Sequence, residues 1–392
     1  MKHFLTILSL AFLISCTSKE TKIIEFLEFE TVQPSSLPHL TTAPNGDIYL
    51  SWIEKGEHTA TTLKYSKLDG NKWSESQSIA TGDDWFVNWA DFPSLMVNGE
   101  QMAAHWLQKS EEGTYDYDVK LSLSSNNGAN WSQAQTVHND GISAEHGFAS
   151  MVPMQNQQTF ITWLDGRNTK EENGAMTLRG AIFDQAGEAQ ERWELDNRIC
   201  DCCQTGAAMT ENGPIVIYRD RSENEIRDMS VVRWVDGAWT QPAPIAIELW
   251  EIAGCPVNGP QITATANQVS AAWFTAAGGT AKVKIAFSED AGATFSSPIL
   301  VSEGNTLGRV GIASLSNGDI VVSYMESKDD KAQIMLAQYS KSGDLIKRVQ
   351  VAETSSERNS GFPVLTTSGD QIIMAWTEAR EKSIVKTASI NL

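Results

Sequence analysis

The sequence predicts an all-β fold, a β-propeller of seven four-stranded blades, and three observations support it. A segment made of an apolar strand, an aromatic residue and a polar turn recurs seven times along the 392 residues. Successive aromatics lie 51 to 57 residues apart, a period typical of solenoids and propellers. Each period contains short β-branched or aromatic runs separated by Gly, Asn, Asp and Pro, which indicates a β-meander. The seven aromatics are Trp52, Trp106, Trp163, Tyr218, Trp273, Tyr324 and Trp376.

The first residues predict export and a lipid anchor. An apolar run, Phe4 to Ile14, is too short to span a bilayer but suits a secretory signal. The run ends in Leu-Ile-Ser-Cys, which resembles the lipobox of bacterial lipoproteins, whose cysteine is lipidated. We therefore expect a signal peptide at 1–15, lipid on Cys16 and a tether at 16–22. The alternative is an ordinary cleavage site that happens to contain a cysteine.

A lipid anchor would place the folded body in the cell envelope, facing the periplasm or the exterior. The membrane would be a partner only through the N-terminal lipid, because no other long apolar stretch follows. We expect a tethered protein rather than one that spans the bilayer.

One propeller domain is expected over residues 23–392. Seven units of about 54 residues use nearly all of this length and leave no room for a second domain. The last unit is long enough for only three strands, so we expect a strand within 23–32 to supply the fourth and close the ring. Such closure leaves no exposed strand edge. The units are expected to begin near Leu37, Phe92, Phe148, Thr205, Pro260, Val310 and Phe362.

The chain is acidic, with 49 Asp and Glu against 30 Lys and Arg and a formal net charge of −19. A field of this sign repels nucleic-acid backbones and anionic membrane surfaces. We therefore expect no nucleic-acid partner, and a ligand that is neutral, cationic or held by a local basic pocket.

Three turns between predicted third and fourth strands share a pattern of Ser, an acid or amide, Gly and an aromatic. The three sets are Ser124, Asn126, Gly128, Trp131; Ser288, Asp290, Gly292, Phe295; and the near match Ser66, Asp69, Gly70, Trp73. The pattern resembles the Asp-box, or BNR, repeat of the sialidase-like β-propellers. In that family the acid caps backbone amides and the aromatic packs between strands, so the motif is structural. Sialidases have six blades, and a six-bladed ring is therefore the alternative to seven.

One face of the ring is expected to bind a ligand. In a propeller, the loops that leave second strands and the loops that enter first strands open on the same face, here called the upper face. These loops gather Arg, carboxylates and Trp, a set suited to a polar ligand. The alternative is that the charges pair and tie neighbouring blades together. The candidate ligand-binding residues are Trp85, Trp89, His146, Arg167, Arg219, Asp220, Arg309 and Arg358.

The resemblance to sialidases implies an active site of three Arg, a Tyr and Glu nucleophile pair, and an Asp as acid/base. The first Arg of that family lies in an Arg-Ile-Pro or Arg-Leu-Pro strand. The comparable segment here reads Ser-Ser-Leu-Pro at 35–38, so this Arg is absent. The other positions have candidates but no matched local pattern. The candidate catalytic residues are Asp91, Asp165 and Tyr218.

Four cysteines form the sharpest local signal. Cys200, Cys202 and Cys203 precede the fourth unit and Cys255 precedes the fifth, so we expect them to meet on the upper face. Structural disulfides are usual in an oxidising compartment, although close neighbours are poorly spaced for a relaxed bridge. A strained, ligand-lining vicinal disulfide is a second alternative. The third is copper or zinc held by thiolates, with Cu(I) favoured by the tight spacing.

The sequence thus favours a lipid-anchored propeller that binds a glycan or other polar ligand without chemistry of its own. In this interpretation Trp85 and Trp89 stack on sugar rings. The first alternative is a sialidase-like glycoside hydrolase. The second is a soft-metal or redox site at the cysteines.

Overall fold

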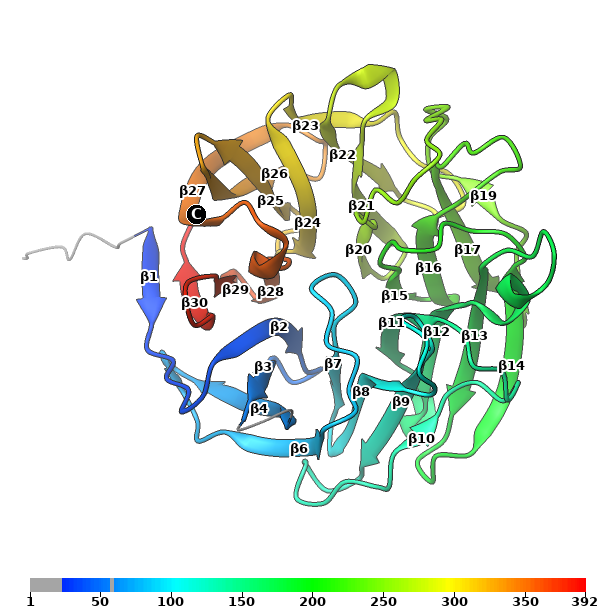
Figure 1. The fold of residues 1–392 in the computed structure, drawn as a ribbon. Coiled ribbons are helices and arrows are strands. Elements are labelled where there is room, and N and C mark those ends of the chain that lie inside the picture. Colours follow the sequence, from blue (N-terminus) through cyan, green and yellow to red (C-terminus); the bar gives the residue numbers. More distant parts are fainter. Residues whose placement is uncertain (1–22, 57–59) are drawn as a thin grey trace, which may run out of the picture.

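The computed structural model describes residues 23–56 and 60–392 (Figure 1). The predicted signal peptide, Cys16 and the tether lie outside the described residues, so their roles stay predictions. No helix in the described part of the chain is long and apolar enough to cross a membrane.

The strands form seven antiparallel sheets arranged in a ring, which confirms the predicted seven-bladed propeller and removes the six-bladed alternative (Figure 1). Blade 1 contains β2 (Ser35–Thr42), β3 (Ile48–Lys55), β4 (Thr61–Asp69), the short β5 (Lys72–Trp73) and β6 (Gln77–Gly82). Blade 2 contains β7 (Ser94–Asn98), β8 (Gln101–Lys109), β9 (Tyr117–Ser124) and β10 (Gln135–Thr136). Blade 3 contains β11 (His146–Pro153), β12 (Thr159–Asp165), β13 (Thr177–Phe183) and β14 (Ala189–Asp196).

The remaining blades follow the same order. Blade 4 contains β15 (Gly206–Thr210), β16 (Gly213–Arg219), β17 (Met229–Val235), β18 (Ala238–Trp239) and β19 (Ala243–Pro244). Blade 5 contains β20 (Gln261–Thr265), β21 (Gln268–Thr275), β22 (Lys282–Ser288) and β23 (Ile299–Glu303). Blade 6 contains β24 (Thr306–Ser314), β25 (Ile320–Lys328), β26 (Lys331–Tyr339) and β27 (Leu345–Ser355). Blade 7 contains β28 (Val364–Ser368), β29 (Gln371–Glu378) and β30 (Ile384–Ile390).

The N-terminal strand closes the ring, as the sequence predicts. β1 (Ile24–Leu27) pairs antiparallel with β30 and becomes the outer strand of blade 7. Ile24 lies opposite Ile390 and Leu27 opposite Thr387. The blade therefore takes strands from both ends of the domain.

The recurring aromatic at the end of each second strand fills the core between blades. All seven residues of β12 are buried, and Trp163 packs in a cluster with Leu121 of blade 2. Its indole N–H donates to Asp165 Oδ2 at 2.8 Å, two residues further on. The same spacing recurs in blade 1, where Trp52 donates to Glu54 at 3.1 Å. In blades 1 and 3 the aromatic thus fixes an acidic side chain at the upper end of the strand.

The turn pattern of blade 5 is a closed hydrogen-bonded hairpin. Ser288 Oγ donates to Asp290 Oδ1 at 2.7 Å and accepts the Gly292 N–H at 2.9 Å. The carboxylate of Asp290 also accepts the N–H of Thr294 at 2.9 Å. The turn lies between the third and fourth strands, on the face opposite the upper face.

The first strands of the blades surround an axial cavity of about 550 Å³. Hydroxyl groups on these strands bond across neighbouring blades, as between Ser150 and Thr205 (2.8 Å). The loop between β6 and β7 extends into the centre of the ring (Figure 1). Near its end, Ala90 O accepts from Gln204 Nε2 of the loop entering blade 4, at 2.5 Å. This loop therefore covers the upper end of the cavity.

Candidate functional site

An Asp, a Tyr and a Glu from three different segments meet at the upper side of blades 2 and 3. Asp91 precedes β7, Tyr117 begins β9, and Glu145 directly precedes β11. The Tyr117 hydroxyl lies 2.9 Å from Asp91 Oδ2 and 3.0 Å from Glu145 Oε1. We call this group the Asp-Tyr-Glu trio.

Backbone and close packing hold the trio in place. The N–H of Phe148 donates to Asp91 Oδ1 at 2.8 Å, and the Tyr117 ring stacks on Phe86 with centroids 4.1 Å apart. A Cβ at Gly147 would lie 2.0 Å from Asp91 Oδ2, so any larger residue there would displace the carboxyl group. The bare backbone of Gly147 is what allows the trio to assemble.

The trio must share a proton. A phenol has a single proton to donate, so its two contacts with carboxyl groups are both favourable only if one carboxyl is itself protonated. Burial raises the pKa of Asp91 to about 8 and the pKa of Glu145 to about 7. Asp91 and Tyr117 are buried, whereas Glu145 is partly exposed. The arrangement can therefore move a proton between a buried acid and the surface.

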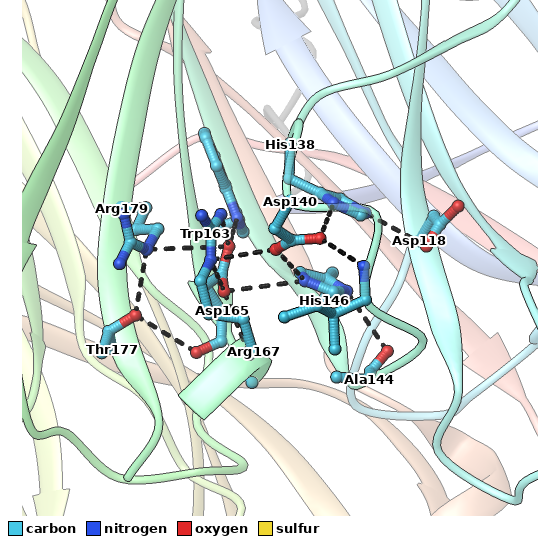
Figure 2. A network of polar contacts seen from close by, with 12 residues as sticks. Asp118, His138, Asp140, Ala144, His146, Trp163, Asp165, Arg167, Thr177 and Arg179 are labelled. Atoms are coloured by element: carbon cyan, nitrogen blue, oxygen red, sulfur yellow. Dashed lines mark hydrogen bonds and ion pairs between the residues drawn. The ribbon is translucent and has the colours of Figure 1, made fainter. Parts of the chain in front are cut away.

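A second polar network lies beside the trio and contains the predicted residues His146, Arg167 and Asp165 (Figure 2). The rings of His138 and His146 stack with centroids 3.6 Å apart. The carboxylate of Asp140 contacts the edge of both rings, 2.9 Å from His138 Nδ1 and 3.1 Å from His146 Nε2.

The guanidinium of Arg167 completes this network. It bonds Asp165 at 2.7 Å and Asp140 at 2.9 Å, so both carboxylates are already paired within the protein (Figure 2). Burial lowers the pKa of His146, which favours its neutral form. Asp165 and His146 are fully buried. The network holds blade 3 against the loop that precedes it, and its charged side chains pair with one another.

Two predicted ligand-binding arginines are buried and satisfied by backbone oxygens. Arg219 donates to the carbonyls of Arg227, Asn258 and Phe274 at 2.7 to 2.8 Å. Arg309 donates to Gly361 O at 2.9 Å, and burial lowers its pKa to about 10. Both side chains tie loops of neighbouring blades together rather than face a pocket.

The two tryptophans predicted to bind the ligand also pack against other aromatic rings of the protein. Trp85 stacks on Trp106 with centroids 5.2 Å apart, and Trp89 stacks on Phe362 at 5.8 Å. Both keep a partly exposed surface. The exposed Arg358 lies with its guanidinium 5.8 Å from the Trp89 ring centre, which leaves these two as an accessible pair on the upper face.

Tyr218 and Asp220 lie in blade 4, outside the trio. The Tyr218 hydroxyl donates to Asp196 Oδ2 at 2.5 Å. Asp220 is partly buried, and burial raises its pKa to about 6. Of the predicted catalytic residues, only Asp91 belongs to the trio.

Sequence reasoning missed two members of the trio, Tyr117 and Glu145. Glu145 lies in a loop that enters a first strand, so the expectation that such loops lie on the upper face applied to it as it did to His146. Tyr117 begins a third strand, and the start of a third strand was not counted among the upper-face segments. No local motif marks either residue.

The cysteines meet as predicted. The Sγ atoms of Cys200, Cys202 and Cys203 lie within 4.8 Å of one another, and Cys202 contacts Cys255. All four are free thiols among the described residues. The structural disulfides therefore stay a prediction.

No protein-family model and no curated protein matches the sequence. Several solved propellers share the fold. An ulvan lyase, described as a new polysaccharide lyase family, is 12% identical with a TM-score of 0.54, over 88% of this chain and 90% of its own. The endosialidase of phage phi92 is 9% identical with a TM-score of 0.53, over 94% and 69%. A protein of unknown function from Dyadobacter fermentans is 12% identical with a TM-score of 0.54, over 94% and 98%. At these identities the likeness shows the fold alone.

Proposed function

We propose that this protein is an envelope lipoprotein that cleaves a glycan on its upper face, with the Asp-Tyr-Glu trio as its acid–base centre. The observation that carries the proposal is the Tyr117 hydroxyl within hydrogen-bond distance of two carboxyl groups that must share a proton. Solved propellers of the same fold include enzymes named for glycan substrates, which supports a glycan as the ligand class. Binding without chemistry is the second candidate, and the partly exposed Trp89 favours it.

Glu145 is the member of the trio that reaches solvent, and we assign it the proton transfer to the substrate. A carboxylic acid with a pKa near neutrality can protonate a leaving glycosidic oxygen and then, as the carboxylate, accept a proton from the water that adds to the sugar. Asp91 and Tyr117 are too buried to touch a substrate. They set the proton occupancy of Glu145 through the shared hydroxyl.

The ligand is proposed to be a neutral glycan. The net charge of −19 repels anions, and the two buried arginines that could have formed a basic pocket already bond backbone oxygens. The partly exposed Trp89, beside the exposed Arg358, offers an aromatic surface for a sugar ring.

The test is a panel of neutral reporter glycosides offered to the full chain and to Glu145→Gln. The substitution should lower the rate roughly 10²- to 10⁴-fold, since it removes the proton but keeps the shape. Glu251→Gln, an exposed carboxylate of an upper-face loop, is the matched control and should keep full activity.

Glycan-array retention separates the two candidate functions. Retention that survives in Glu145→Gln while turnover disappears supports the hydrolase. Retention without turnover by the wild-type chain, lost in Trp89→Ala, would favour the pure binder. Neither retention nor turnover across the panel would contradict both.

A further inference from the structure

Two loops of the upper face bring together all four cysteines of the described residues. Cys200, Cys202 and Cys203 lie in the segment leading into blade 4, and Cys255 lies in the loop entering blade 5. Cys200 and Cys203 are buried, Cys202 is half-buried and Cys255 is exposed. The trio takes no part in this cluster, so the cysteines call for a separate explanation.

The spacing of the sulfur atoms fits a shared metal ion. The Sγ atoms of Cys200 and Cys203 are 3.6 Å apart, and that of Cys202 lies within 4.8 Å of both. A disulfide needs about 2.05 Å. Two thiolates bound to one metal through bonds of about 2.3 Å lie about 3.8 Å apart at a tetrahedral angle, and slightly further apart at a trigonal one. Only small shifts would let three sulfurs reach one ion.

The surroundings favour a thiolate, the form of cysteine that binds metals. Arg227 Nη1 donates to Cys200 Sγ at 3.1 Å, and Arg227 is itself buried and paired with Glu225 at 2.7 Å. A buried guanidinium beside Cys200 Sγ favours negative charge on this sulfur.

We infer that Cys200, Cys202 and Cys203 form a binding site for a soft monovalent metal ion, Cu(I). Three thiolates from four consecutive residues suit a trigonal Cu(I) centre, whereas structural zinc takes four ligands at wider sequence spacing. Each thiol that binds gives its proton to solvent, so binding strengthens as the pH rises. Cys255 lies at the exposed rim and is not one of the three ligands.

The test uses the full chain, reduced and kept anaerobic, titrated with Cu(I) against a competing chelator. We expect one Cu(I) per chain and Cu(I)-dependent protection of the half-buried Cys202 from alkylation. Cys202→Ser should weaken the affinity by more than the roughly 10- to 100-fold typical of an outer-shell change. Cys255→Ser is the matched control and should keep one Cu(I) per chain with the same protection.

Three results would overturn the inference. One is a wild-type chain that holds no more Cu(I) than Cys202→Ser. Another is tighter retention of Zn²⁺ than of Cu(I) in the same competition. The third is a disulfide among these cysteines, found by mass spectrometry of the unreduced chain, that persists when Cu(I) is offered. Thiol protection in the wild-type chain keeps the test decisive even if Cys202→Ser does not fold.

Discussion

The carboxyl group of Asp91 accepts the N–H of Phe148 and meets the Tyr117 hydroxyl, yet burial still raises its pKa to about 8. The two hydrogen bonds favour the charged form, but removal from water outweighs them. A carboxyl of this kind carries a proton at neutral pH in the folded protein and loses it in the unfolded chain. Its titration is therefore linked to folding.

The contribution of Asp91 to the stability of the protein should fall as the pH rises from about 4 to about 8. In this range the unfolded chain has released the proton of Asp91 while the folded chain keeps it, so the titration of this group increasingly favours the unfolded state. Glu145 contributes a slope of the same sign up to about pH 7. Asp91→Asn should remove the Asp91 contribution from the dependence of melting temperature on pH. Glu289→Gln, an exposed control, should leave the slope unchanged, and an equal slope in Asp91→Asn would contradict the assignment.

At the residue scale the sequence predicted which residues lie near the upper face better than it predicted what their side chains bond. Arg219 is the last residue of β16 and Arg309 lies near the start of β24, both toward the upper face as expected, but their guanidinium groups bond backbone carbonyls. The spacing of residues in the sequence predicts the segment that holds a residue, but it does not predict the direction in which the side chain points. The contact between Tyr117 and Asp91 was missed for the same reason, because it depends on the close approach allowed at Gly147.

At the element scale the periodic segments were predictable because strand burial repeats with the blades. The aromatic at the end of each second strand and the Ser-x-Asp-x-Gly turn both reflect packing that recurs from blade to blade. The two-residue strand β18 had no such signal, since it is the extension of a hairpin. Strands whose packing repeats from blade to blade can be predicted from the sequence, whereas short extensions of a single hairpin cannot.

Asp290→Ala should lower the free energy of unfolding by about 1 kcal/mol, because the blade 5 turn loses hydrogen bonds that its carboxylate accepts. Urea unfolding measures the change. Glu289→Ala removes the neighbouring exposed acid and should have no comparable effect. Equal effects of the two substitutions would show that the carboxylate does not stabilise the turn.

At the scale of the whole molecule, stability depends on joining the two ends of the domain. The closing strand β1 buries Leu27, whereas Phe26 of the same strand is 62% exposed. Without this strand, β30 would be an open edge, which invites pairing with another chain. Closure was predictable from the sequence because blade 7 lacks the residues for a fourth strand.

Leu27→Ala should lower the free energy of unfolding by about 2 kcal/mol through the cavity that it leaves. Phe26→Ala, on the opposite face of β1, should cost clearly less. Thermal unfolding followed by both tryptophan fluorescence and circular dichroism would measure the two changes and show whether the ring melts as one unit. A larger loss for Phe26→Ala would contradict the described orientation of β1.

The pairing of β1 with β30 also joins two strands that the ribosome makes at very different times. The ribosome makes Ile24 hundreds of residues before Ile390, its partner across the strand pair. Until then the first strand has no partner in its own blade and the edge of blade 1 has no neighbour on that side. The ring can therefore close only after β30 has been made, and a chaperone that keeps the earlier segments from aggregating would protect the chain until that pairing forms.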